Sequence, residues 1–277
     1  MNKNKKNLYE DYKTISILKE TYFWVKDNLD VNYPDRPISN YSYMADAENV
    51  EEVCKFISAF GTGIKNFKMV DVPVEKVINK LPKSIKDKLM SDLEKRRVEI
   101  KKEKDVEKMA FIMRSNKDFF ILNIDNNQNI TCKTIQFSHE KSNIFFSLDE
   151  ESDGTIRLLD LLEVLLSNKN KTYVIDELDR CLHPSLSYKF IKIFLQKAEK
   201  SNIQLIVTTH ESRLMDFDLL RRDEIWFVNK KSSGESDIYS LEEYNERFDK
   251  KIDKAYLEGR YGGVPIFSTV FPIEKED

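Results

Sequence analysis

The spacing of apolar and polar residues changes twice along the chain, and the first segment has a helical period. Apolar residues recur every three or four positions, which predicts helices over 9–29 and 47–60. Residues 74–106 keep this spacing but are strongly charged, which predicts one or two long exposed helices. We therefore expect residues 1–107 to form a mainly helical interaction region.

The second segment has a β-type pattern. Its runs are short, rich in β-branched and aromatic residues, and separated by polar turns, which is typical of an antiparallel meander. The segment spans residues 108–149, and its expected strands are 109–114, 119–124, 130–137 and 144–148.

The third segment, residues 150–277, alternates helices with strands. The expected elements are an apolar helix through 158–165, strand 172–175, helix 184–200, strand 203–207, a short helix after His210 and strand 224–228. Such alternation is typical of a parallel sheet with helices on its faces. The predicted fold class is therefore α/β, with a parallel-sheet lobe preceded by the helical and β-meander regions.

Composition favours a folded protein without a generally basic surface. The chain has 277 residues, 40% of them hydrophobic, including 17 Phe and 12 Tyr, which is enough for a core. The formal charge of −3 argues against a coat that binds nucleic acid. The lysine-rich stretch 83–104 alternates with Asp and Glu, so we interpret it as a solvated helix face, and nucleic-acid binding has no support.

The cysteines and the apolar runs indicate in which cellular compartment the protein is expected. Cys54, Cys132 and Cys181 are far apart and show no CxxC spacing, so neither a zinc site nor a disulfide framework is expected. The first residues lack the apolar run of a secretion signal. No segment approaches the roughly 20 apolar residues that cross a bilayer. We expect a soluble cytoplasmic protein without a membrane partner.

Two adjacent carboxylates follow the apolar run 172–175. Asp176 and Glu177 come at the end of a predicted parallel strand, where ligands bind in α/β folds. One carboxylate can hold hydrated Mg²⁺ on phosphate oxygens, and its neighbour can deprotonate the attacking water. Taken alone, this short motif is more often an acidic turn after a buried strand.

His210 makes the chemical interpretation the favoured one. It follows strand 203–207, the next predicted strand, and should therefore stand beside Asp176 and Glu177 in the sheet. An imidazole in that position can contact a γ-phosphate. A histidine after a strand is otherwise usually a local capping residue.

A third candidate element is the turn 151–155 before the apolar helix. The Ser152 hydroxyl and the backbone N–H groups exposed around Gly154 would form an anion site at a helix N-terminus. The simpler interpretation is an ordinary helix cap by Ser152 or Asp153.

These motifs together resemble a known family. Ser-x-Gly before a helix, Val-Ile-Asp-Glu followed by Leu-His-Pro, and Thr-Thr-His are similar to the C-terminal half of an ABC-type AAA ATPase. The group concerned is found in phage-defence and abortive-infection systems and includes relatives of the overcoming-lysogenisation-defect ATPases. The ending 256–265 resembles the tail of these proteins. The resemblance implies a P-loop NTPase-like lobe that uses ATP and Mg²⁺.

The resemblance also implies roles for single residues. Asp176 and Glu177 match the Walker B pair, with Asp176 on the metal and Glu177 as catalytic base, and His210 matches the switch histidine. Two further sets match regions that contact nucleotide: Ser152 and Gly154 in the signature loop, which reaches the nucleotide of the opposite subunit, and His183 in the D-loop.

The chain departs from this family in lacking the phosphate-binding loop, GxxxxGK followed by Ser or Thr. Only seven glycines are present, and Gly61-Thr-Gly-Ile-Lys65 has the wrong spacing. We therefore expect the Walker A lobe to come from another chain or segment, and residues 1–277 alone to be inactive. The expected assembly is a homo- or hetero-dimer with nucleotide between subunits, gating a toxin or nuclease effector.

Two other functions remain open. The chain could be a non-catalytic interaction module that binds a toxin or nucleic acid and keeps a relic ATPase site. A two-metal nuclease using Asp176, Glu177 and Asp179 is disfavoured, because three carboxylates within one turn do not surround a common metal pair.

Overall fold

The computed structural model describes residues 13–45, 50–79, 81–100, 109–124, 129–140, 142, 144–166, 170–244 and 252–265. Its helices are α1 (Lys13–Asn28), α2 (Ser42–Ala45), α3 (Val50–Ala59), α4 (Val74–Ile78), α5 (Lys83–Ile100), α6 (Asp153–Leu166), α7 (Pro184–Ala198) and α8 (Ile252–Leu257). Its strands are β1 (Leu29–Asn32), β2 (Ile64–Asp71), β3 (Met109–Arg114), β4 (Phe119–Ile124), β5 (Ile130–His139), β6 (Phe145–Ser147), β7 (Lys171–Ile175), β8 (Ile203–Val207), β9 (Trp226–Lys230) and β10 (Ser236–Ser240).

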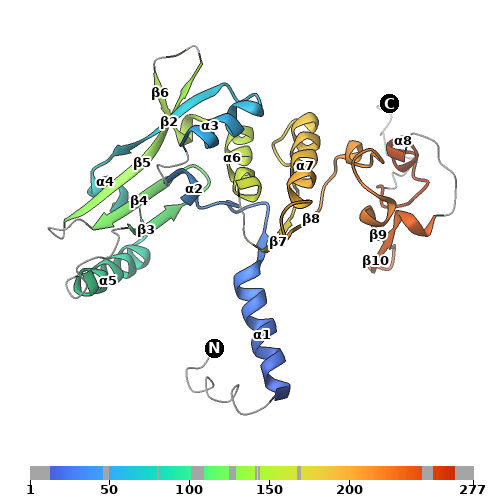
Figure 1. Ribbon diagram of the computed structural model, residues 1–277, viewed down its shortest axis with the longest axis horizontal. Coiled ribbons are helices and arrows are strands. Elements are labelled where there is room, and N and C mark those ends of the chain that lie inside the picture. Colours follow the sequence, from blue (N-terminus) through green and yellow to red (C-terminus); the bar gives the residue numbers. More distant parts are fainter. Residues whose placement is uncertain are drawn as a thin grey trace, which may run out of the picture.

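Asp176, Glu177 and His210 follow strands of a three-stranded parallel sheet with the order β1-β7-β8 (Figure 1). The parallel pairing of β7 with β8 confirms the prediction. The presence of β1 was not predicted: the helix expected over 9–29 ends at Asn28, and Leu29–Asn32 pairs with β7 instead. Residues 9–12 of that helix lie outside the described residues.

A second sheet is antiparallel and has five strands. Its order is β2-β5-β4-β3, with β6 also paired to β5, which confirms the predicted meander. Strand β2 comes from the segment predicted to be mainly helical, and it pairs with β5 from Ile64 to Asp71. The division of the chain at residue 107 stays a prediction.

Helix α6 lies between the two sheets and joins their cores (Figure 1). Consecutive residues Ile156 to Leu162 are all buried, so this helix is covered on every side. One continuous cluster runs from Phe137 of the five-stranded sheet through Leu159 to Tyr173 and Ile175 of the parallel sheet. The start of α6 is therefore fixed by packing on both sides.

The charged region 74–106 was predicted to form one or two long exposed helices; it contains one long helix, α5, preceded by the five-residue helix α4, which buries Val77 and Ile78. Helices α4 and α5 are separated by a short break, and residues 101–106 lie outside the described residues. Leu93 of α5 packs on Leu122 and Ile124 of β4 in a second, smaller cluster. Helix α5 therefore packs against the five-stranded sheet.

The last strand prediction was wrong in its partner. Strand β9 begins at Trp226 rather than at residue 224, and it pairs antiparallel with β10 instead of joining the parallel sheet. The hairpin has its own core, in which Phe227 stacks on Tyr261. The short helix expected after His210 is a 3₁₀ turn, Ser212–Leu214. Within the described part of the chain, no helix is long and apolar enough to span a membrane.

Candidate functional site

The ends of β7 and β8 meet at Asp176, Glu177 and Thr208. The Thr208 hydroxyl donates a hydrogen bond to Oδ1 of Asp176 and accepts one from the backbone N–H of Glu177 at 2.9 Å. Thr208 N–H in turn donates to the carbonyl of Ile175, the last residue of β7, at 3.1 Å. One threonine thus orients the metal-ligand candidate and the backbone of the base candidate together.

The backbone of Glu177 is in the left-handed region, with φ 48°. This conformation is uncommon for a residue with a side chain, costs about 1–3 kcal/mol, and persists only where surrounding contacts hold it. It turns the chain sharply after β7, so that Asp176 and Glu177 do not continue the alternation of the strand. Both side chains are half-buried.

Arg157 of α6 holds this turn from the other side. Its guanidinium donates to the backbone carbonyls of Asp176, at 3.3 Å, and of Glu177, at 2.8 Å. Burial lowers the pKa of the guanidinium, which nevertheless remains charged because its unperturbed value is so high. Hydrogen bonds from a buried cation to carbonyl oxygens are among the stronger ones. We interpret Arg157 as a residue that positions Glu177.

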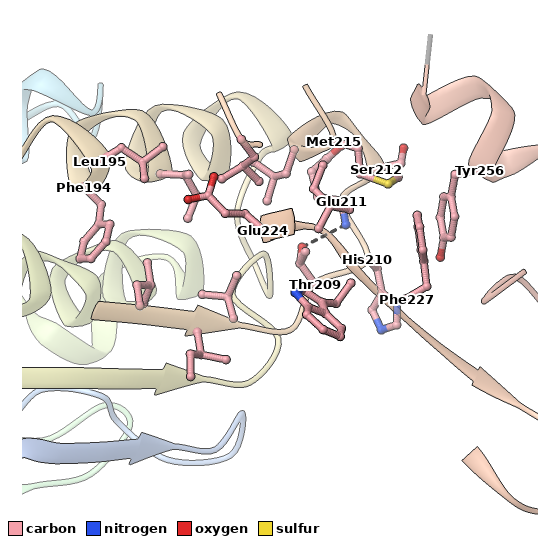
Figure 2. A pocket seen from close by; sticks show the side chains of 18 of the residues that line it. Phe194, Leu195, Thr209, His210, Glu211, Ser212, Met215, Glu224, Phe227 and Tyr256 are labelled. Atoms are coloured by element: carbon pink, nitrogen blue, oxygen red, sulfur yellow. Dashed lines mark hydrogen bonds between the residues drawn. The ribbon is translucent and has the colours of Figure 1, made fainter. Parts of the chain in front are cut away.

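His210 is at the predicted strand end, beside a second small network. Oδ1 of Asp179 accepts from the Thr209 hydroxyl at 2.6 Å and from the backbone N–H of His210 at 3.2 Å. The Thr209 hydroxyl also accepts from the N–H of Glu211, and the exposed His210 side chain lines a groove next to it (Figure 2). The structure therefore brings Asp176, Glu177 and His210 together at the carboxyl-terminal ends of the strands of the parallel sheet.

The turn before α6 is capped by Ser152. Its hydroxyl accepts from the N–H of Thr155 at 3.1 Å and shares a hydrogen bond with the Thr155 hydroxyl at 2.9 Å. This confirms the capping interpretation, whereas a contact with nucleotide stays a prediction. A Cβ on Gly154 would lie 2.8 Å from the Cys181 carbonyl oxygen, so glycine lets α6 approach the turn after β7 closely.

His183 also has a capping role. Its Nδ1 accepts from the N–H of Ser185 at 3.3 Å at the start of α7, and its side chain is exposed. Pro184 follows at the first helical position, where it loses no intrahelical hydrogen bond. The predicted contact of His183 with nucleotide is not tested by this arrangement.

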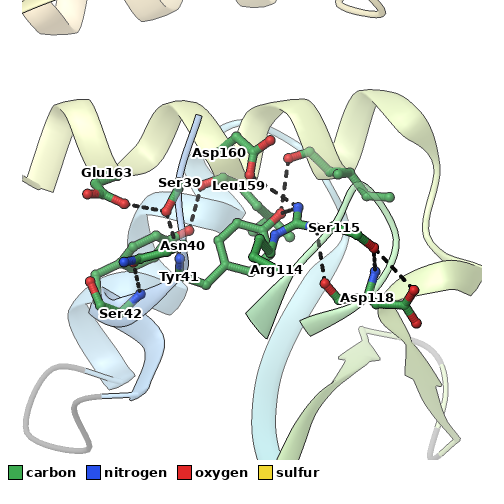
Figure 3. Close-up of polar contacts among 12 residues, drawn as sticks. Ser39, Asn40, Tyr41, Ser42, Arg114, Ser115, Asp118, Leu159, Asp160 and Glu163 are labelled. Carbon is green, nitrogen blue, oxygen red and sulfur yellow. Dashed lines mark hydrogen bonds and ion pairs between the residues drawn. The ribbon is translucent and has the colours of Figure 1, made fainter. Parts of the chain in front are cut away.

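Polar contacts tie α6 to the five-stranded sheet (Figure 3). The Arg114 guanidinium lies 3.3 Å from Oδ1 of Asp160 and donates to the Tyr41 hydroxyl at 2.7 Å, and both charged side chains are nearly fully buried. Burial raises the pKa of the Asp160 carboxyl to about 6, although Arg114 opposes that shift. Nearer the start of α6, Nε2 of His139 lies 2.9 Å from Oε1 of the buried Glu151. These contacts fix the helix that begins after Ser152.

The carboxylate of Asp176 is suited to a Mg²⁺ site. Mg²⁺ usually binds one or two protein carboxylates and keeps water and phosphate oxygens as its other ligands, which fits Asp176 at a half-exposed strand end. Asp179 instead accepts hydrogen bonds from Thr209 and His210. Within the described residues, no group of three or more His, Cys, Asp and Glu side chains could hold a metal ion.

Three features of this site were not predicted from the sequence: the contacts of Arg157, those of Thr208 and the hydrogen bonds accepted by Asp179. Arg157 carries a signal that could have identified it, because it is the basic residue of a mostly apolar helical run. Thr208 lies directly at the end of a predicted strand, next to His210. The hydrogen bonds of Asp179 depend on how the turn after β7 folds.

The comparison with protein families agrees with this geometry. The model described as "AAA domain, putative AbiEii toxin, Type IV TA system" matches residues 3–216, which is 214 of the 277 residues. The match includes β1, α6, β7, α7 and β8, together with every candidate residue named above. No curated protein matches the chain. The match over most of its length means that the chain belongs to this family of AAA domains.

Proposed function

We propose that the chain supplies the metal-binding and water-activating half of an ABC-type ATPase site. The carrying observation is the Thr208 hydroxyl, which joins Asp176 and the Glu177 backbone where β7 and β8 end side by side. Membership of an AAA family supports ATP and Mg²⁺ as the cofactors. The missing phosphate-binding loop would come from a Walker A lobe on another chain or segment.

Asp176 would hold Mg²⁺ through the carboxylate that Thr208 orients. The ion, when bound, neutralises charge on the phosphate oxygens. Glu177 would accept the proton of the attacking water, and Arg157 keeps its backbone in the required turn. His210 would contact the γ-phosphate from the neighbouring strand end.

Ser152, Gly154 and His183 would face the nucleotide of an opposite subunit. All three lie at helix N-terminal turns, where backbone N–H groups and the helix dipole favour an anion. This arrangement requires a homo- or hetero-dimer with ATP between the subunits. The family description mentions a putative toxin of a type IV toxin–antitoxin system, so we propose that hydrolysis gates a toxin or nuclease effector in the cytoplasm during phage defence.

The decisive variant is Glu177→Gln, measured with the Walker A lobe supplied. It removes the base and keeps the size of the side chain, so turnover should fall by about 100-fold or more. Mg²⁺-ATP should still bind, and the dimer should accumulate in size-exclusion chromatography with light scattering. Glu75→Gln, on the exposed face of α4, is the matched control. Unchanged turnover in Glu177→Gln would refute the base assignment.

A non-catalytic interaction module is the second candidate. The observation in its favour is that Ser152 and His183 already accept hydrogen bonds as helix caps. The two functions predict different effects of nucleotide on the assembly state. If Mg²⁺-ATP and the Walker A lobe together leave the assembly state unchanged, the module is the better description.

A further inference from the structure

A small pocket lies where four segments of the chain meet. Its volume is about 250 Å³, and it is lined by the loop after β1, the β3–β4 turn, the first half of α6 and the turn after β7. Pockets for drug-sized ligands usually exceed about 300 Å³, so this one suits a smaller ligand. The described residues that line it include none of those assigned above to metal, water or nucleotide: Ser152, Gly154, Asp176, Glu177, His183 and His210.

The two carboxylates in the lining of this pocket are already paired with cations. Asp153 lies 3.1 Å from Lys117, which also lines the pocket. Asp160 lies 3.3 Å from the nearly fully buried guanidinium of Arg114, which comes from the five-stranded sheet (Figure 3). Neither carboxylate is therefore free to neutralise the other cations of the pocket.

The remaining cations of the lining are three arginines: Arg36, Arg157 and Arg180. Among the described residues, none of the three forms an ion pair with a carboxylate. Arg180 donates to the backbone carbonyl of Pro34, and Arg157 donates to that of Glu177. The side chains of Arg36 and Arg180 are exposed, so an anion from solvent can reach them. Charges of one sign in a concave site raise the local concentration of ions of the opposite sign.

Arg157 shows most clearly that a counter-charge is missing. The residue is only 7% exposed, and its Nε–H is buried without a hydrogen-bond partner among the described residues. Burial lowers the pKa of the guanidinium most, Asp160 opposes this shift, and the charge of Arg180 adds to it. A buried charge is costly unless it is paired and hydrogen-bonded. An anion in the pocket would supply the missing partner.

We propose that this pocket binds a phosphate group through Arg36, Arg157 and Arg180. The planar guanidinium suits phosphate best among side chains, because its N–H donors form a rigid fork. The lining has four cations and two carboxylates, and this excess of two positive charges matches a phosphate dianion. The small volume admits the phosphate group alone. The group is therefore either free inorganic phosphate or the end of a larger molecule that extends out of the pocket.

A bound phosphate would also act on the turn that carries Glu177. The guanidinium of Arg157 lines the pocket and donates to the carbonyls of Asp176 and Glu177. An anion that fixes this guanidinium therefore fixes the turn after β7. The pocket itself is formed by this chain alone, so phosphate binding does not depend on ATP hydrolysis.

Phosphorus NMR of inorganic phosphate, titrated with residues 1–277 at an ionic strength fixed with chloride, measures binding directly. The natural chain should broaden the phosphate signal. Arg36→Gln removes a charged donor and should weaken binding by about tenfold or more. Arg36→Lys keeps the charge and should weaken binding less. Arg260→Gln, at another exposed arginine, is the matched control and should bind normally. Circular dichroism checks that the variants fold. No broadening, or equal binding by Arg36→Gln and the natural chain, would overturn the proposal.

The exposed Cys181 locates the bound anion, because it also lines the pocket. Saturating phosphate should slow the alkylation of Cys181 by iodoacetamide severalfold, as measured by peptide mass spectrometry. The half-buried Cys54 lies outside the lining and serves as an internal control, whose rate should stay the same. Equal protection of Cys181 by chloride at the same ionic strength, or no protection by phosphate, would contradict a phosphate site in this pocket.

A parallel titration with adenosine monophosphate distinguishes the two sources of the phosphate group. Protection of Cys181 at similar concentrations of both compounds identifies free phosphate as a sufficient ligand. Protection by the nucleotide at concentrations about tenfold lower or less assigns the group to a nucleotide. Acetate that protects as well as phosphate would overturn the proposal, because the pocket would then accept any small anion.

These measurements are also separate from the proposed ATPase function. They use the chain without a Walker A lobe, so a failure to bind phosphate leaves the role of Glu177 intact. Full turnover by Glu177→Gln in the assembly would in turn leave the phosphate site intact.

Discussion

The two sheets of this protein differ in how much of their surface the described residues cover. The five-stranded antiparallel sheet buries Phe119, Phe137 and Ile135 completely against α3 and α6. The three-stranded parallel sheet is buried on one face, but its other face and its β8 edge expose Val31 and Ile206. The candidate residues are all on or beside the three-stranded sheet, which we call the incomplete sheet, whereas the five-stranded sheet, which we call the complete sheet, holds α6 in place.

Replacing an apolar side chain by alanine should lower the unfolding free energy much more in the complete sheet than at the β8 edge of the incomplete sheet, and this is the largest expected difference. Phe137→Ala removes a fully buried ring and should lower the free energy of unfolding by about 3–5 kcal/mol. Ile206→Ala, on the exposed edge, should cost less than about 1 kcal/mol in the isolated chain. Urea denaturation measures both. Equal losses would mean that the chain already packs the β8 edge, and the comparison between the sheets would fail.

Burial of the Asp160 carboxyl between α6 and the complete sheet should make stability depend on pH. The pKa of Asp160 is raised to about 6, so between the unfolded value and 6 the folded protein binds more protons than the unfolded chain. The contribution of Asp160 to stability is therefore present at low pH and is lost as pH rises through 6.

Asp160→Asn isolates this contribution, because asparagine does not titrate. Relative to the natural chain, the variant should gain about 2 kcal/mol in unfolding free energy when pH is raised from 4.5 to 7. Urea denaturation at both pH values provides the measurement. If the difference between the two proteins stays constant with pH, burial does not raise the pKa of Asp160.

A substitution at the strand ends of the incomplete sheet, where the candidate site lies, should lower the unfolding free energy by a smaller amount. Thr208→Val keeps the shape of the side chain but removes the hydroxyl that bonds Asp176 and the Glu177 N–H, and it should cost about 1 kcal/mol. Thr21→Val is the control, because that hydroxyl bonds only within α1. A Thr208→Val chain as stable as the control would show that this hydroxyl does not hold the two strand ends together.

The smallest effect is expected at an exposed ion pair near the start of α6. Lys117 lies 3.1 Å from Asp153, and both side chains are more than half exposed. Lys117→Ala should change the unfolding free energy by less than about 0.5 kcal/mol, because solvent screens the pair. A loss above 1 kcal/mol would give this contact a part in holding α6 on the complete sheet.

The sequence predicted those parts of the fold that depend on local pattern. The meander, α6, β7, α7 and β8 follow from apolar spacing, and the meeting of Asp176 with His210 follows from the rule that parallel strands share an edge. Strand β1 was missed because four residues directly after a helix carry no period of their own. The partner of β9 was predicted wrongly because alternation of elements does not specify which strands pair.

The candidate site could be predicted only in part for the same reason. Asp176, Glu177 and His210 are visible as polar residues after apolar runs. The contact of Arg157 with the carbonyls after β7 depends on how α6 packs across the sheet, and the left-handed backbone of Glu177 is found at that same contact. Such features arise from tertiary structure, and a local pattern does not contain them.

We propose that the parallel sheet carries half of an ATPase site. The test is steady-state ATP hydrolysis with Mg²⁺, measured for residues 1–277 alone and with the Walker A lobe added. We expect no turnover by the chain alone, and turnover in the assembly that Glu177→Gln lowers by about 100-fold or more. Turnover by residues 1–277 alone, lost in Glu177→Gln, would contradict it, because the chain would then contain a complete site.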